Sequence, residues 1–218
     1  MARELSLIKL IELGTEFCGS YSLSGAHSAD LRQNDGEKAV FGIPALSSVK
    51  KLSAFVERMK GFPGHAKATK ALPYILGNSG SPMETALVML LTLPYRFGGF
   101  GLPAPELNST VRPLKSAKRS SSKKFYRCDL FWPDYDLAVE YDSDAEHTGS
   151  LRIAEDSKRR NTISSLGILM IIVTKQQIYS DLEFEKVAML LASNLGRQLR
   201  YQKKEFVKNH RELRKQML

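Results

Sequence analysis

The stretch CDLFWPDYDLAVEYDSDAEH, from Cys128 to His147, holds two apolar runs separated by the turn sequence PDYD. The runs predict strands over residues 125–132 and 136–142. The same stretch contains seven carboxylates in its twenty residues. An unpaired carboxylate inside a buried strand is very costly in free energy. The sequence therefore predicts that a positively charged partner meets these acids.

The segments around this stretch predict the rest of an α/β core with a mixed sheet. A helix is expected over Ser81 to Pro94, with Ser81 as cap, Pro82 at the first helical position and Glu84 at the third. FGGFGLPAPELN, residues 97–108, is expected to be a rigid loop. Residues 150–167 predict another helix, and the β-branched run over 168–174 predicts a strand buried on both faces. From Leu182 to about Arg214 the chain is expected to be helical.

The first 78 residues predict a mostly helical extension. LSLIKLIELG is expected to form a short helix that ends at Gly14. A second helix is expected from Ser47 to Lys60, with a Ser cap, and a third over residues 65–76. No motif in this part indicates a role. We expect three segments: an extension over 1–78, a core over 79–181 and a basic C-terminal helix over 182–218, packed on the core or extending from it.

The composition narrows the class of protein. Among 218 residues, 43% are hydrophobic, which is enough for a core and argues against disorder. No apolar run reaches about 18 residues, so no membrane span is expected. The two cysteines lack the spacing of a zinc site or a disulfide framework, and the N-terminus lacks a secretion signal. These features are typical of a cytoplasmic protein.

The net charge of +9 indicates an anionic polymer as partner, most often nucleic acid. One basic block between residues 111 and 128 contains no acid, and the chain beyond residue 197 is also strongly basic. Such residues give salt-sensitive affinity for phosphates with little sequence choice. The block over 111–128 is expected either to contact phosphates or to be disordered. Its basic residues are Arg112, Lys115, Lys118, Arg119, Lys123, Lys124 and Arg127.

Three acids of the opening stretch can share one face of the predicted sheet. Glu140 and Asp142 are two residues apart on a strand and point the same way, and a hairpin register would let Asp129 reach that face. Carboxylates this close repel unless a cation or a proton lies between them. A ligand set of oxygens alone favours Mg²⁺ or Mn²⁺. For Asp129 a pairing with Arg127, and for Glu84 a capping role, are the structural alternatives.

The pattern of Asp129, ten intervening residues and then Glu140-Tyr141-Asp142 resembles the PD-(D/E)XK nuclease superfamily. More narrowly it resembles the branch of very-short-patch-repair-like endonuclease domains, including uncharacterised bacterial members. That branch has a Glu on a helix, an Asp on the second strand and E-x-D-[G/S] at the end of the third. The resemblance covers residues 80–180 and implies a restriction-endonuclease-like fold. The corresponding residues are Glu84, Asp129, Glu140, Asp142, Ser143, His147, Asp156, Arg159 and Arg160.

The resemblance also implies a mechanism. Asp129, Glu140 and Glu84 would hold Mg²⁺ against the phosphate, and Arg160, Arg159 or Lys158 would neutralise developing charge. The family usually has Lys where this chain has Asp142, so His147 or Asp142 would act on the attacking water instead. Lys158 and Arg159, with Lys115, Lys118, Arg119, Lys123, Lys124 and Arg127, are the expected nucleic-acid contacts.

The sequence therefore predicts a Mg²⁺-dependent endodeoxyribonuclease, with a homodimer as one possible assembly. Two alternatives stay open. One is a nuclease-fold module that binds nucleic acid without cutting, because the usual Lys is absent. The other is an RNA-directed nuclease that acts as a toxin or in defence. Metal-dependent cutting separates the endodeoxyribonuclease from the module that binds without cutting. The choice between DNA and RNA as substrate separates it from the RNA-directed nuclease.

Overall fold

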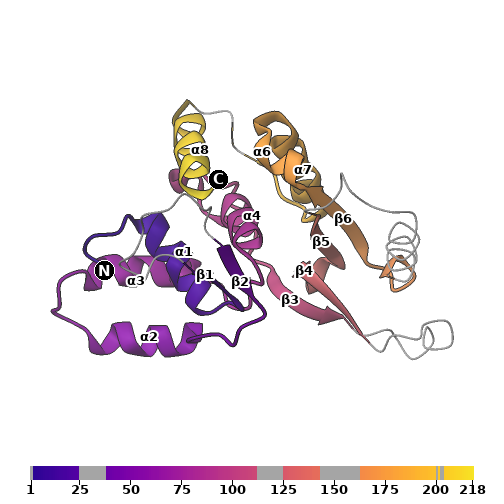
Figure 1. Ribbon diagram of the computed structural model, residues 1–218. Coiled ribbons are helices and arrows are strands. Elements are labelled where there is room, and N and C mark those ends of the chain that lie inside the picture. The colour runs from indigo at the N-terminus through magenta and orange to yellow at the C-terminus, as the bar shows by residue number, and fades with distance from the viewer. Residues whose placement is uncertain (1, 25–37, 112–124, 143–162, 200, 202–203) are drawn as a thin grey trace. The chain divides into compact units, whose positions relative to one another are not determined.

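The computed structural model describes residues 2–24, 38–111, 125–142, 163–199, 201 and 204–218 (Figure 1). These residues gather into two units, one of Met1–Gly99 with Tyr201–Leu218 and the other of Phe100–Arg200. The contacts thus group the chain differently from the expected segments 1–78, 79–181 and 182–218. In the described residues, no helix is both long and apolar enough to cross a membrane.

Local capping chemistry starts the helices of the first unit. Ser6, Ser48 and Ser81 each accept a hydrogen bond from a backbone N–H of the first turn that follows. The predicted helices over Ser47 to Lys60 and Ser81 to Pro94 are confirmed. The helices are α1 Leu7–Phe17, α2 Val49–Arg58, α3 His65–Ala71 and α4 Pro82–Thr92, with the 3₁₀ turns η1 Leu72–Tyr74 and η2 Tyr95–Phe97.

The predicted end of the first helix at Gly14 is wrong, because α1 continues to Phe17. Gly14 has a packing role instead. A Cβ atom at this position would lie 2.9 Å from Cγ1 of Ile75 and would also meet Cδ1 of that side chain. The glycine therefore lets the chain at Ile75 approach the helix closely, and it does not end the helix.

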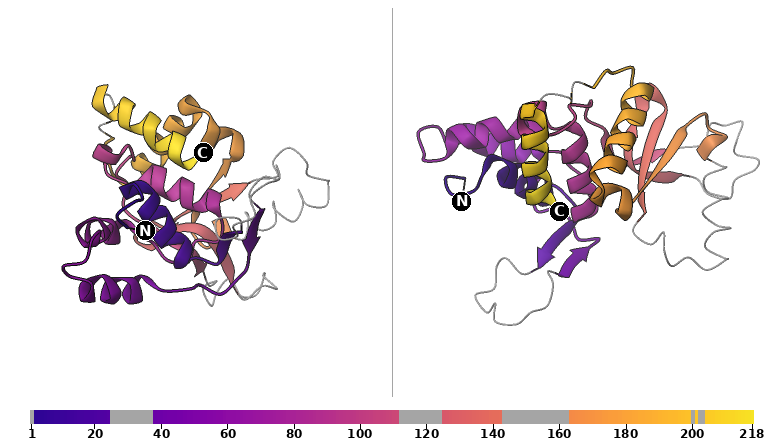
Figure 2. Two further views of the ribbon diagram at one scale, coloured as in Figure 1. Left: turned by 60° about the vertical axis from the view of Figure 1, so that its left-hand side comes forward. Right: turned by 90° about the horizontal axis from the view of Figure 1, so that it is seen from above.

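The first unit also contains a two-stranded antiparallel sheet that the sequence did not predict (Figure 2). Strand β1, Tyr21–Ser24, pairs with β2, Lys38–Phe41, and Tyr21 lies opposite Phe41. Each strand has four residues, which is too short for a clear alternation of polar and apolar side chains.

A buried chain of hydroxyls joins β1 to the start of α4. The hydroxyls of Tyr21 and Ser79 both lie 2.8 Å from Oγ1 of Thr85, and Ser79 also donates to the backbone oxygen of Ser81. Burial raises the pKa of Tyr21 well above its usual range, and nearby carboxylates, including Glu84, raise it further. The phenol is therefore neutral, and the hydrogen bonds offset the cost of burying these polar groups.

Replacement of Thr85 by Val should lower the free energy of unfolding by about 1–3 kcal/mol, because the buried Tyr21 hydroxyl loses its partner. Thr92→Val on the same helix is the matched control, since the Thr92 hydroxyl donates to Val88 O of its own helix. Chemical denaturation of both variants measures the difference. Equal losses would show that the hydroxyl chain does not stabilise the unit.

The predicted single helix from Leu182 to Arg214 is wrong. Helix α7, Asp181–Asn194, ends before Gly196, which has a positive φ of 61°. A separate helix, α8 Lys204–Met217, belongs to the first unit. There His210 Nδ1 donates to Gly98 O at 2.6 Å, and Asn209 Nδ2 donates to Arg96 O at 3.2 Å.

A four-stranded mixed sheet forms the second unit, in the order β3-β4-β5-β6. The pairs β3–β4 and β4–β5 are antiparallel, and β5–β6 is parallel. Together with its helices this sheet confirms the predicted α/β class. The strands are β3 Glu106–Val111, β4 Tyr126–Trp132, β5 Leu137–Asp142 and β6 Leu169–Thr174, with the turn η4 Pro133–Tyr135 and the short helix α6 Lys175–Tyr179.

Two details of this sheet differ from the predictions. The loop expected through Asn108 ends earlier, because β3 begins at Glu106. Strand β6 was expected to be buried on both faces, yet Leu169 is 47% exposed while Val173 is buried. The expectation is wrong because β6 lies at the edge of the described sheet, next to β5 alone.

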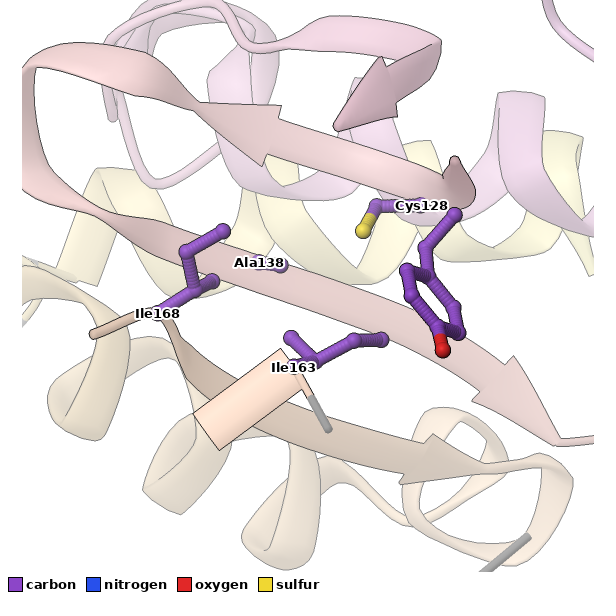
Figure 3. Packing of buried hydrophobic residues seen from close by; sticks show 5 residues of the cluster. Cys128, Ala138, Ile163 and Ile168 are labelled. Atoms are coloured by element: carbon purple, nitrogen blue, oxygen red, sulfur yellow. The ribbon is translucent and has the colours of Figure 1, made fainter. Parts of the chain in front are cut away.

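Buried side chains of β4 and β5 fix the middle of the sheet. Leu130 is fully buried, and the indole N–H of Trp132 donates to Pro103 O at 2.8 Å. A cluster of five buried residues also includes Ile163, near the end of the predicted helix over 150–167, and Ile168, directly after it (Figure 3). Its other members are Tyr126, Cys128 and Ala138. Residues 150–162 of that predicted helix lie outside the described residues. Cys18 and Cys128 are both buried, and they are not joined in a disulfide.

Candidate functional site

Asp129 lies on β4 where the pairing with β3 is interrupted. Leu107 pairs with Leu130 and Ser109 with Cys128, but the position between them, Asn108 opposite Asp129, is skipped. Asn108 has a positive φ of 49°, which an extended strand residue does not adopt. Such backbone outliers inside a strand cost free energy, and they concentrate at functional sites.

The pairing of β4 with β5 also ends next to Asp129. It runs from Trp132–Leu137 to Leu130–Val139, and one further step would pair Asp129 with Glu140. Instead, Oδ2 of Asp129 accepts a hydrogen bond from the backbone N–H of Tyr141 at 2.9 Å. The Asp129 carboxylate thus lies beside the peptide that joins Glu140 to Tyr141.

Glu140 and Asp142 end β5 on one face of the sheet. All six residues of β5 pair in parallel with β6, so the alternation of side chains is regular along this strand. Both acids therefore share the face of Ala138, as predicted. The first three residues of β5 are buried and the last three are half-buried. The strand thus emerges from the core where its acids begin, and Asp142 lies opposite Thr174 at the end of β6.

Glu84 has the capping geometry that the sequence allowed. Its backbone N–H donates to Ser81 Oγ at 3.1 Å, and its Oε2 accepts from the N–H of Gly80 at 2.8 Å. The side chain is 93% buried at the start of α4, since its exposure is 7%. Glu84 belongs to the first unit, whereas Asp129 and Glu140 belong to the second. Its role as a third metal ligand stays a prediction.

Most of the predicted basic contacts lie outside the described residues. Arg127 is described and is exposed on β4, opposite Thr110 of β3. The predicted base His147 and the arginine Arg160 also lie outside, as does Asp156. The other predicted site residues outside the described part are Lys115, Lys118, Arg119, Lys123, Lys124, Lys158 and Arg159.

Within the described part of the chain, no group of three or more His, Cys, Asp or Glu side chains is placed to hold a metal ion. The candidate metal ligands in the second unit are therefore the two acids Asp129 and Glu140, with Asp142 following on β5. Carboxylate oxygens are suitable donors for Mg²⁺ or Mn²⁺. The pair thus fits a hard divalent cation by its chemistry.

Sequence reasoning missed the backbone features that position Asp129. Strand β3, the positive φ of Asn108 and the N–H of Tyr141 as hydrogen-bond donor were not expected. Asn tolerates left-handed backbone better than most residues, so Asn108 itself was the one available signal. The Tyr141 interaction has no signature in the sequence.

The comparisons with known proteins give two distant relatives. Both are uncharacterised proteins of Mycobacterium tuberculosis, Rv2248 of strain H37Rv and MT2308 of strain CDC 1551. Each is 26% identical to this chain over 142 residues, which is 65% of this chain. The match covers 47% of each relative, so the chain spans about half of their length. No family model and no solved structure matches the chain.

Proposed function

We propose that the protein is a Mg²⁺-dependent endonuclease that hydrolyses phosphodiester bonds of DNA, with Asp129 and Glu140 as metal ligands. The observation that supports this most is the position of the Asp129 carboxylate. It lies in the opening between β4 and β5, 2.9 Å from the N–H of Tyr141 and next to the residue that bears the second acid.

The order of the elements supports the same proposal. Helix α4 bears Glu84, and β3, β4 and β5 follow as three antiparallel strands. Asp129 is on the second of these strands, and Glu140 and Asp142 end the third. This is the order that the resemblance to very-short-patch-repair-like endonuclease domains requires. The residue pattern alone predicted only the second and third of these strands, β4 and β5.

The proposed roles follow from what the side chains can do. The hydrogen bond from Tyr141 fixes the direction of the Asp129 carboxylate, as partners of metal ligands commonly do. A bound divalent cation would polarise the phosphate and lower the pKa of a water molecule. Asp142 or His147 would orient that water, and Arg160, Arg159 or Lys158 would neutralise the phosphate. The resemblance implies Glu84 as a further ligand, directly or through water.

Two observations favour the alternative of a nuclease-fold module that binds nucleic acid without cutting it. Asp129 and Glu84 both accept hydrogen bonds from backbone N–H groups, so each acid also stabilises the fold. Asp142 occupies the position at which the PD-(D/E)XK nuclease superfamily usually has Lys. In this alternative the acids persist for structural reasons, and hydrolysis is absent.

A substrate panel tests the proposal. Supercoiled plasmid, single-stranded circular DNA and an RNA transcript are each incubated with the full chain in Mg²⁺, Mn²⁺ or EDTA. We expect nicking of the plasmid in either metal and none in EDTA. Cleavage of RNA alone would support the RNA-directed nuclease, and binding without cleavage of any polymer would support the non-catalytic module.

A further inference from the structure

Helix α2 uses only one of its faces for packing. Val49, Leu52 and Val56 are half-buried, and the helix contacts α3 and η1 of the same unit (Figure 1). The remaining residues of α2 are exposed, and they include Phe55, whose exposed fraction is 51%. An aromatic ring on the solvent side of a helix whose apolar face is already packed does not contribute to the core.

Basic residues flank this ring along the helix. Lys51 precedes Phe55 by four residues and Arg58 follows it by three, so the three side chains share one exposed face. Phe62, 59% exposed, follows within a turn after the helix. We refer to Lys51, Phe55 and Arg58 as the α2 face.

The surrounding segment is strongly basic. Between Lys38 and Tyr74 the chain has seven lysines and arginines and one acid, Glu57. Lys67 is engaged, because its Nζ donates to the backbone oxygens of Arg3 and Leu5. The other basic residues are Lys38, Lys50, Lys51, Arg58, Lys60 and Lys70. A local excess of positive charge attracts polyanions.

We propose that the α2 face binds single-stranded nucleic acid, with Lys51 and Arg58 on phosphates and Phe55 stacked on a base. Aromatic rings between basic side chains are the usual means of binding single strands without sequence choice. A duplex keeps its bases stacked on one another, so it offers no base face to Phe55 along its length. The inference goes beyond the proposed cleavage, since α2 lies in the unit that contains neither Asp129 nor Glu140.

An anionic membrane surface is the competing partner for a basic helix. Interfacial helices insert a continuous apolar face into the lipid boundary. The apolar residues of α2, Val49, Leu52 and Val56, are half-buried on the packed side, which leaves Phe55 as the large apolar side chain of the exposed side. One aromatic ring among charged residues suits stacking better than insertion.

Anisotropy of a fluorescent oligothymidylate, titrated with the full chain in EDTA, tests this inference separately from cleavage. Phe55→Leu should weaken binding roughly 10-fold, because it removes stacking but keeps an apolar side chain, and Phe55→Tyr should bind as wild type. Lys51→Ala and Arg58→Ala should each reduce the slope of log affinity against log salt by about 0.7. Lys9→Ala is the charge control and should leave the slope unchanged, because the Lys9 ammonium is paired with Glu12 on α1 of the same unit.

Two results would overturn the inference. One is equal affinity of Phe55→Leu and wild type for the oligonucleotide. The other is binding to vesicles of anionic lipid, retained in Phe55→Leu, without binding to the oligonucleotide. Both readouts are independent of the plasmid assay, so a failure of the proposed cleavage leaves this inference standing, and the reverse is also true. A matched oligouridylate separates DNA from RNA as the preferred strand.

Discussion

The Asp129→Asn variant should nick plasmid DNA at least about 100-fold more slowly than wild type and still unfold at the same temperature. An amide oxygen can accept the hydrogen bond from Tyr141 N–H, so the link between β4 and β5 persists. The negative charge is lost, however, and a neutral amide is a much weaker ligand for Mg²⁺. A metal contributes several kcal/mol to the transition state, and each 1.36 kcal/mol is a factor of ten in rate.

The Asp129→Ala variant separates the two roles of this carboxylate. It loses the hydrogen bond as well as the charge, and the free energy of unfolding should fall by about 1–3 kcal/mol. Nicking rates and thermal melting of both variants give the comparison. If Asp129→Asn cuts as fast as wild type, the carboxylate is a structural group and not a metal ligand.

The Gly98→Ala variant should lose about 3 kcal/mol of stability, with the loss concentrated at α8. Gly98 has a φ of +89°, and a Cβ atom there would lie 2.7 Å from His210 N and closer still to Asn209 O. The cost combines left-handed backbone strain with a clash against helix backbone that cannot simply rotate away. It also disturbs the hydrogen bond from His210 to Gly98 O. Chemical denaturation measures the total, and hydrogen exchange of α8 amides localises it.

Gly61→Ala is the matched control in the same unit. Its φ of +85° is nearly the same, but nothing lies within 4 Å of the added Cβ. We expect a cost of about 1 kcal/mol from backbone strain alone. A loss in Gly98→Ala no larger than that in Gly61→Ala would contradict the tight docking of α8 on the Gly98 loop.

Helix α4 was predictable because its signals are local. Ser81 accepts from Glu84 N, Pro82 occupies the first turn, and Glu84 reaches Gly80, all within five residues. Interactions over such short spans follow from residue type and spacing. The same reasoning predicted α2 and its Ser48 cap.

Features that depend on distant partners were not predictable. Gly14 looked like the end of a helix, and only the proximity of Ile75 explains it. Strand β3 follows two prolines and contains a left-handed Asn108, so it lacks the pattern of a strand, and its partner β4 stabilises it. The end of α7 near Gly196, and the return of α8 to the first unit, likewise depend on tertiary contacts.

The candidate site was predictable only where its geometry is local to one strand. Spacing alone placed Glu140 and Asp142 on one face of β5, and the regular pairing with β6 agrees. The direction of Asp129 depends instead on the single skipped pair between β3 and β4 and on the opening of β4 from β5, which spacing does not encode. The hydrogen bond to Tyr141 follows from that opening.

The most direct test of a metal-dependent nuclease at β4 and β5 compares wild type with Glu140→Gln, purified in the same way, on supercoiled plasmid. The rate of nicking is measured in Mg²⁺ and in EDTA. We predict nicking by wild type in Mg²⁺ alone and a loss of at least about 100-fold in Glu140→Gln. Equal nicking by the variant, or nicking by wild type in EDTA, would contradict the proposal.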